Sequence, residues 1–191
     1  MDQDEDSLLV QLTINIDRSF ETLMTLYWPQ LYAFIFRRTA SQHDAEDIAS
    51  EAFVRAYVAL KGYPVERIRT LKLRPWLYKI TYHEYCRFIG KSSESALSMA
   101  CIEEGISIEQ EEEQQPENIF ESVERRLELE GLVATLPERY REVISLYYFE
   151  ELNYQEIADL LEQPIGTVKS SVHRGLRLLR MKSGAQPDQV Y

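Results

Sequence analysis

The chain has 191 residues, of which 45% are hydrophobic and 11% aromatic, so it can bury one medium core or two small ones. Its net charge of -11 argues against a protein that binds nucleic acid through uniform positive charge. No apolar run approaches the roughly eighteen residues of a membrane span, and no basic-then-apolar leader opens the sequence. We therefore expect a cytoplasmic protein without membrane insertion.

The charges are unevenly distributed along the chain. Residues 55–91 hold nine Lys and Arg but two Glu, and residues 167–182 hold five Lys and Arg but no acid. Residues 92–121 hold nine Glu and no base. Two basic segments therefore lie within an acidic chain. Cys86 and Cys101 lack partners at ligand spacing, so we expect two ordinary thiols, with no metal site and no cofactor.

Helix-period spacing of apolar residues recurs along the chain, and no alternating run predicts a strand, so the expected fold class is all-α. An acidic leader occupies residues 1–17. Apolar residues from Phe20 to Ile35 then repeat at three and four, with Pro29 kinking or restarting that helix. A second helix is expected from Asp44 to Leu60, and a third from Pro75 to Gly90.

The composition changes after the third predicted helix. Residues 92–121 are acidic and polar without helical period, which is typical of a solvated, flexible linker. From Ile119 to Lys182 helical patterning returns, with breaks at Pro137, Asn153 and residues 163–166 that predict four short helices. We expect two small helical domains at 18–91 and 122–183, joined by this linker and followed by a tail at 184–191.

The second domain contains a helix-turn-helix pattern. Asn153 and Glu156 predict a capping box at the start of a short helix. A turn follows at 162–166, and Thr167 is expected to cap a second helix that ends near Met181. One arc of that helix is apolar: Val168, Val172, Gly175, Leu176 and Leu179. The opposite arc is polar and free of acid: Lys169, Ser170, His173, Arg174, Arg177 and Arg180. An acid-free basic arc favours DNA binding over an ordinary solvated face.

The basic segment of the first domain is rich in aromatic residues. Tyr57, Tyr63, Trp76, Tyr78, Tyr82, Tyr85 and Phe88 alternate with Arg and Lys. Such a pattern is typical of proteins that stack unpaired bases on aromatic rings and hold phosphates with cations. The alternative is that these rings form the core of a helical domain, which for Trp76 and Tyr85 is at least as good an interpretation. The helical spacing of these rings does not distinguish a base-stacking surface from a domain core.

Four blocks of the chain, at 44–57, 74–80, 136–161 and 164–180, together resemble the extracytoplasmic-function (ECF) sigma factors of bacterial RNA polymerase, within the sigma-70 superfamily. The resemblance extends over about residues 18–182. It implies that the first domain is sigma region 2, which binds the polymerase core and melts the -10 promoter element. It implies that the second is sigma region 4, whose helix-turn-helix reads the -35 element. Transcription initiation and its regulation are the expected function.

The resemblance also assigns residues. For -35 binding it implies Lys169, Ser170, Ser171, His173, Arg174, Arg177 and Arg180. For the -10 element, as duplex and as melted single strand, it implies Arg69, Lys72, Arg74, Trp76, Tyr78, Lys79, His83 and Arg87. For docking on the largest subunits of the polymerase core it implies Asp44, Asp47, Ile48, Ser50, Glu51 and Phe53. An anti-sigma factor is a further partner that the resemblance leaves open. Melting is expected to use capture of flipped bases, and no P-loop is present.

The chain departs from the family pattern at four of these positions. Ser50 stands where Gln is common, which affects one expected core contact. His83 stands where Asn is usual and Arg87 where Asp is common, which predicts an altered -10 preference. Ser171 stands where Arg is frequent, which removes one phosphate contact. The slope of log binding constant against log salt concentration for -35 binding is therefore expected to be shallower by about 0.9.

Three other classes of function compete with this interpretation. A stand-alone helix-turn-helix regulator would dimerise and bind duplex DNA without polymerase. An interaction protein would occupy the polymerase or an anti-sigma factor without starting transcription. An enzyme is the weakest alternative, because the sequence has no HExxH, no GxSxG and no Cys/His cluster.

Overall fold

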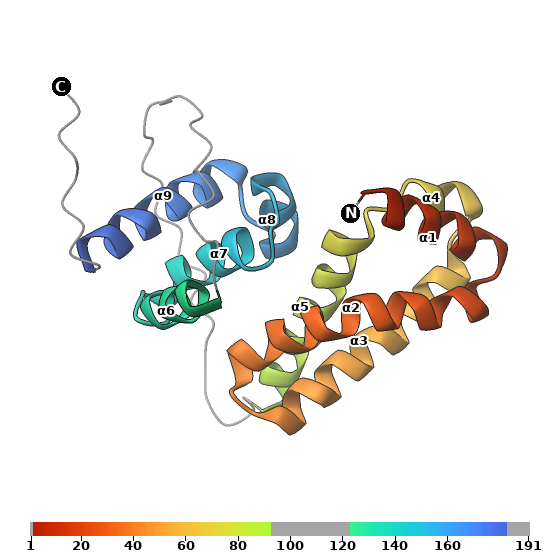
Figure 1. Ribbon diagram of the computed structural model, residues 1–191, viewed down its shortest axis with the longest axis horizontal. Helices are drawn as coiled ribbons and strands as arrows, with labels where there is room; N and C mark the ends of the chain where they lie inside the picture. The colour runs from red at the N-terminus through yellow and green to blue at the C-terminus, as the bar shows by residue number, and fades with distance from the viewer. Residues whose placement is uncertain (1, 93–122, 183–191) are drawn as a thin grey trace.

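The computed structural model describes residues 2–92 and 123–182, and within these ranges it contains nine α-helices and no strand (Figure 1). The all-α prediction is confirmed. The N-terminal half comprises α1 (Asp2–Ile14), α2 (Ile16–Thr39), α3 (Gln42–Gly62), α4 (Val65–Arg69) and α5 (Leu73–Ser92). The C-terminal half comprises α6 (Val123–Ala134), α7 (Glu138–Tyr148), α8 (Tyr154–Leu161) and α9 (Ile165–Lys182). The predicted tail, Cys101 and nearly all of the predicted linker lie outside the described residues.

The core of the N-terminal half lies between α2, α3 and α5, which pack on one another. Each helix buries a stripe of apolar residues at spacings of three and four, as the sequence predicts. Phe34 of α2, Phe53 of α3 and Leu77 of α5 are all at most 2% exposed. At the start of α3, the Ser41 side chain accepts a hydrogen bond from the Asp44 amide, so α3 begins two residues earlier than expected.

Helix α2 continues through Pro29 instead of restarting there. Proline removes one backbone donor inside the helix, which costs stability. Tyr27 and Leu31, on either side of Pro29, are 4% and 0% exposed, and their burial compensates for the missing hydrogen bond. The helix ends at Ala40, whose φ of 51° is left-handed and whose amide donates to the Phe36 carbonyl.

Helix α1 was not predicted, because the acidic composition of the first residues suggested only a leader. Its Leu8, Leu9 and Leu12 are buried, and the helix packs on α2 and α4. These three leucines have the one, three and four spacing of a helix face, which is the signal that could have revealed it. Glu5 of α1 also accepts a hydrogen bond from the Leu73 amide at 2.8 Å, which satisfies a backbone donor at the start of α5.

In the C-terminal half the predicted breaks are confirmed and one boundary is wrong. The four helices are separated at Pro137, Asn153 and residues 162–164. Helix α9, however, begins at Ile165 and not after Thr167. The Pro164 carbonyl already accepts hydrogen bonds from the Thr167 and Val168 amides, because the fixed φ of proline favours a helix start. Thr167 therefore lies inside the first turn.

Candidate nucleic-acid interface

The helix-turn-helix consists of α8, the turn after it and α9. The expected capping box is present: the Asn153 side chain accepts from the Glu156 amide and the Glu156 carboxylate accepts from the Asn153 amide, both at 3.0 Å. Helix α8 ends at Glu162, whose φ of 55° lets the chain reverse into α9. Helix α9 then packs its apolar arc, with Val168, Val172 and Leu179 buried, against α7 and α8.

The polar arc of α9 faces away from that packing. Lys169, His173, Arg174, Arg177 and Arg180 are exposed, and Ser170 and Ser171 are half-buried. The Lys169 ammonium also lies 5.8 Å from the Tyr154 ring centroid, and Tyr154 stacks on Tyr147. Helix α9 contains no acidic residue. Its outward arc therefore offers donors and cations to an anionic surface, and α9 itself supplies no acidic side chain to compete with that surface.

The residues predicted to bind the -10 element lie on α5 and in the segment just before it, and they fall into two groups. Arg69, His83 and Arg87 are exposed, and Trp76 is half-buried with its ring centroid 6.1 Å from that of Tyr63. Trp76, His83 and Arg87 follow one another at helical spacing, so they share one side of α5. The others, Lys72, Arg74, Tyr78 and Lys79, contact the C-terminal half of the chain.

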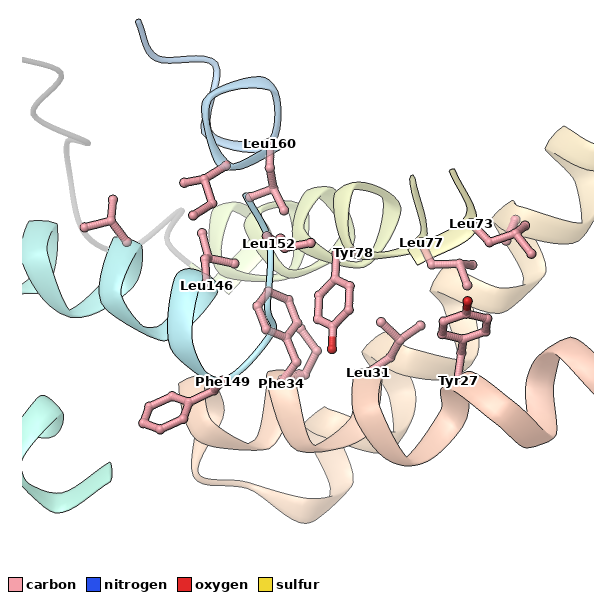
Figure 2. Packing of buried hydrophobic residues seen from close by; sticks show 14 of the residues in the cluster. Tyr27, Leu31, Phe34, Leu73, Leu77, Tyr78, Leu146, Phe149, Leu152 and Leu160 are labelled. Atoms are coloured by element: carbon pink, nitrogen blue, oxygen red, sulfur yellow. The ribbon is translucent and has the colours of Figure 1, made fainter. Parts of the chain in front are cut away.

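Tyr78 lies inside the molecule, between the two halves. Its side chain is fully buried, packs edge-on against Phe34 with 5.0 Å between ring centroids, and lies close to Leu152 (Figure 2). Its hydroxyl donates a 2.7 Å hydrogen bond to Glu150. Burial, together with the charge of Glu150, raises the pKa of Tyr78, so the hydroxyl keeps its proton and remains a donor. In this conformation Tyr78 cannot touch DNA.

Glu150 connects the two halves and was missed from the sequence. It is 2% exposed, and its carboxylate accepts from both Tyr78 and Arg37, a residue near the end of α2. Around it, Arg74 pairs with Glu151 at 3.1 Å and Lys72 with Glu156 at 3.4 Å. No sequence pattern points to these pairs, because their partners lie 72 to 113 positions apart.

The family comparisons match both halves of the chain. The model of sigma-70 region 2 matches residues 23–94, and the model of sigma-70 region 4 matches residues 126–179. The ECF RNA polymerase sigma factor SigW of Bacillus subtilis is 33% identical over 167 residues, which cover 85% of this chain and 87% of SigW. The chain belongs to the ECF sigma factors. The ECF sigma-E factor of Escherichia coli is 29% identical over 88% of this chain and 89% of its own length.

Solved structures agree with this fold. CnrH in complex with the cytosolic domain of CnrY superposes with a TM-score of 0.60 and 19% identity, over 95% of this chain and 98% of CnrH. RpoE of Bartonella quintana, in complex with the anti-sigma factor NepR, gives 0.61 and 20% over 88% of this chain and 99% of RpoE. As an ECF sigma factor, the protein associates with RNA polymerase and directs transcription initiation at promoters.

Sigma factors as a class are not enzymes and act in the cytoplasm. Among the residues that the structure describes, no helix is long and apolar enough to cross a membrane. The same residues contain no group of three or more His, Cys, Asp or Glu arranged to hold a metal ion.

Helix α3 of region 2 contains the residues predicted to bind the polymerase core. Asp47, Ser50 and Glu51 are exposed and Asp44 is half-buried. Ile48 and Phe53 instead belong to the core of region 2, at 3% and 2% exposed, and Phe53 stacks on Trp28. The exposed side of α3 continues through Val54 and Val58, which are 56% and 63% exposed and were not predicted.

Proposed function

We propose that this ECF sigma factor reads the -35 element with the polar arc of α9 and the -10 element with α5 and the residues just before it. The observation that carries the proposal is the outward arc of α9, where exposed cations line one side while the apolar side is packed on α7 and α8. We take region 2 as residues 18–91 and region 4 as residues 122–183.

In region 4, the proposed contacts are those of a helix lying in the major groove. An α-helix fits that groove, and Arg side chains can hold guanine through two hydrogen bonds. Arg174 and His173, near the middle of α9, are proposed to contact bases. Arg177, Arg180 and Lys169 are proposed to bind phosphates, with Ser170 and Ser171 as shorter donors.

In region 2, Trp76, His83 and Arg87 form the proposed surface for melted -10 DNA, together with Arg69. A half-buried indole next to Tyr63 offers an aromatic face for an unpaired base, and the neighbouring cations offer phosphate contacts. Lys72, Arg74 and Lys79 are proposed to join them once they are released from region 4. Base capture requires no cofactor, and we propose none.

Core polymerase is proposed to dock on the exposed side of α3. Asp47, Ser50 and Glu51 supply polar contacts, and Val54 and Val58 extend them with apolar area. Such a mixture of a small apolar patch with a polar rim is usual for protein interfaces. Ile48 and Phe53 would then act indirectly, by holding α3 on the core of region 2.

An anti-sigma factor is proposed as a further partner. The support is that two solved structures with this fold, CnrH and RpoE, are complexes, and NepR is named an anti-sigma factor. The proposed place of action is the bacterial cytoplasm, in association with the nucleoid.

Run-off transcription tests the proposed function. Purified core polymerase, the sigma factor and a genomic promoter library should give a discrete set of transcripts that core alone does not make. The double variant D47R/E51R should lose core binding, whereas E21R, a charge change on the exposed side of α2, should not. Core binding without any selective transcript would instead support an interaction protein that does not initiate.

A further inference from the structure

Two acidic residues, Glu150 and Glu84, are buried in the part of the chain that the structure describes. Glu150 lies between regions 2 and 4, whereas Glu84 lies within region 2, on α5. It is 8% exposed and follows His83 of the proposed -10 surface directly in the chain. A buried carboxylate is tolerated only where cations or hydrogen bonds replace its lost hydration. The partners of Glu84 therefore explain its place in the fold.

Glu84 holds two arginines that come from two helices. Arg55 of α3 pairs with it through Nε. Arg87 of α5 donates to it through Nη1, at 3.1 Å from one carboxylate oxygen and 3.3 Å from the other. Arg55 is also held by Glu51, one turn earlier in α3, at 3.0 Å from its Nη2. We call Arg55, Glu84 and Arg87 the Glu84 cluster, and it joins α3 to the proposed -10 surface.

The two arginines of the Glu84 cluster are held in different ways. Arg55 contacts acids through both Nε and Nη2, so its charge is compensated within the protein. Arg87 reaches Glu84 through Nη1, and its side chain is 50% exposed. Its Nε and Nη2 lie outside that pair and form the edge of the guanidinium from which two N–H groups point in the same direction. Glu84 therefore leaves to Arg87 the edge that fits two neighbouring acceptors.

The place of Arg87 on α5 directs this edge toward the proposed -10 surface. Arg87 follows His83 by four residues, so the two side chains are neighbours on the helix. Glu84 precedes Arg87 by three residues and lies on the side of α5 that packs on α3. A cation held by an acid thus stands at a position where Asp is the residue expected of the family. This is a difference in charge at the proposed -10 surface.

Stability alone does not account for a buried acid at this place. Apolar residues of similar volume often replace a buried ion pair without loss of stability. Glu84 also adds a negative charge close to a surface that is proposed to bind an anionic strand. Orientation of Arg87 offsets both costs, because a guanidinium that is already held in place loses less side-chain freedom when it binds.

We propose that Glu84 is a positioning residue of the -10 surface. It holds the Arg87 guanidinium beside His83 so that Nε and Nη2 contact a base of the melted non-template strand, while Arg55 anchors Glu84 on α3. A base with two neighbouring acceptors, as guanine has, fits this edge. The inference rests on the proposed function and deepens it, since it assigns Arg87 to a base and gives part of the -10 selectivity to a buried residue.

Strand binding by the holoenzyme tests the inference. Core polymerase carrying the full chain is titrated with a short non-template strand from a promoter found by run-off transcription, and with oligo-dT of the same length as reference. The measured quantity is the ratio of the two affinities, because a change in overall charge acts on both strands alike. The control variant E21Q removes an exposed acid of α2 outside the Glu84 cluster and should keep the wild-type ratio.

E84Q keeps the size of the side chain and one acceptor oxygen but removes the charge that holds Arg87. It should lower the ratio about fivefold, with the loss confined to one position in a base-by-base scan of the strand. R87K keeps the charge but replaces the planar fork by one ammonium group, and it should lower the ratio by a similar factor. E84Q/R87K should have the same ratio as R87K, because Glu84 acts through the fork of Arg87.

Circular dichroism and urea denaturation check the folding of each variant. E84D keeps the charge but draws the carboxylate back by one methylene. It should also lower the ratio, and it decides the question if E84Q does not fold.

Three results would overturn the role of Glu84. A folded E84Q with an unchanged ratio would show that the residue only joins α3 to α5 or only repels the strand. A fall of both affinities by the same factor would identify Arg87 as a phosphate contact. Independent losses in E84Q and R87K that multiply in the double variant would show that Glu84 does not act through Arg87. A wild-type holoenzyme without preference for the promoter strand would instead overturn the proposed -10 reading, and this inference with it.

Discussion

His83 is one of the two residues of the proposed -10 surface at which this chain is expected from its sequence to differ from its family. It is exposed on α5, on the same side as Trp76 and Arg87. An imidazole and an asparagine amide place donors and acceptors differently, so they favour different bases. We predict that His83→Asn changes the base preference at one position of the -10 element in a base-by-base promoter scan. An unchanged base preference in that scan would show that His83 does not contact a base of the -10 element.

Gly175 lies at a close contact between α9 and α7. A Cβ added there would lie 2.8 Å from Ile144 Cγ1 and 3.4 Å from Tyr140 Cβ. We predict that Gly175→Ala lowers the free energy of unfolding by about 1–3 kcal/mol through overpacking, as measured by urea denaturation. Ile144→Val should recover part of that loss.

Gly131 provides the matched comparison, because a Cβ there meets nothing within 4 Å. Gly131→Ala in α6 should raise stability by about 0.5–1 kcal/mol, since alanine favours the helix. Equal effects at the two glycines would contradict the close approach of α9 to α7.

At the scale of the element, α9 is the part of the molecule for which sequence reasoning was most successful. Its apolar and polar arcs follow from a 100° rotation per residue, and the burial of Val168, Val172, Gly175 and Leu179 confirms them. The start of α9 was wrong because Thr167 is a good cap on its own, whereas Pro164 fixes the backbone earlier. The spacing of apolar residues does not show which of two neighbouring residues starts a helix.

The polar arc of α9 gives a prediction for DNA binding. Arg174→Ala should weaken binding to the -35 element by about 1–3 kcal/mol and relax the preference at one base pair. Competition binding with a set of single-base variants of the -35 duplex measures both effects. An equal loss on every sequence would identify Arg174 as a phosphate contact.

Helix α1 was missed because acidic composition outweighed three leucines in a short segment. Leu12 is fully buried among α1, α2 and α4. We predict that Leu12→Ala lowers the free energy of unfolding by about 2–4 kcal/mol, followed by thermal or urea denaturation. Val10→Ala, at a side chain that is 54% exposed, should change it by less than about 0.5 kcal/mol. Similar values for both would mean that α1 does not pack in solution.

At the scale of the whole molecule, the contact between the domains was beyond sequence reasoning. The DNA-binding residues of α5 were implied by the family resemblance, yet Tyr78 lies in the core and Arg74 pairs with Glu151. Pairs between residues more than 70 positions apart depend on how two finished domains meet. The spacing of apolar residues identifies the buried face of a single helix, but it does not show which surfaces of two domains contact each other.

The uneven charge of the whole chain leads to a prediction for free and polymerase-bound protein. A chain of net charge -11 is repelled by duplex DNA except at its two basic segments. We predict that at about 0.1 M salt the free sigma factor binds a promoter duplex at least about 100-fold more weakly than the holoenzyme does, because the polymerase raises its effective concentration. Fluorescence anisotropy measures both affinities. Tight binding by a free dimer would favour a stand-alone regulator.

The hydrogen bond from the Leu73 amide to Glu5 has a consequence for the order of folding during synthesis. Helix α1 is made before the rest of region 2, but two of its partners, α4 and the start of α5, are made up to 68 residues later. At about 5–20 residues per second, that delay is about 3–14 seconds. The pairing of α2 with α3 can precede these later contacts, so α1, although it also packs on α2, completes its packing on region 2 only after that pair of helices exists.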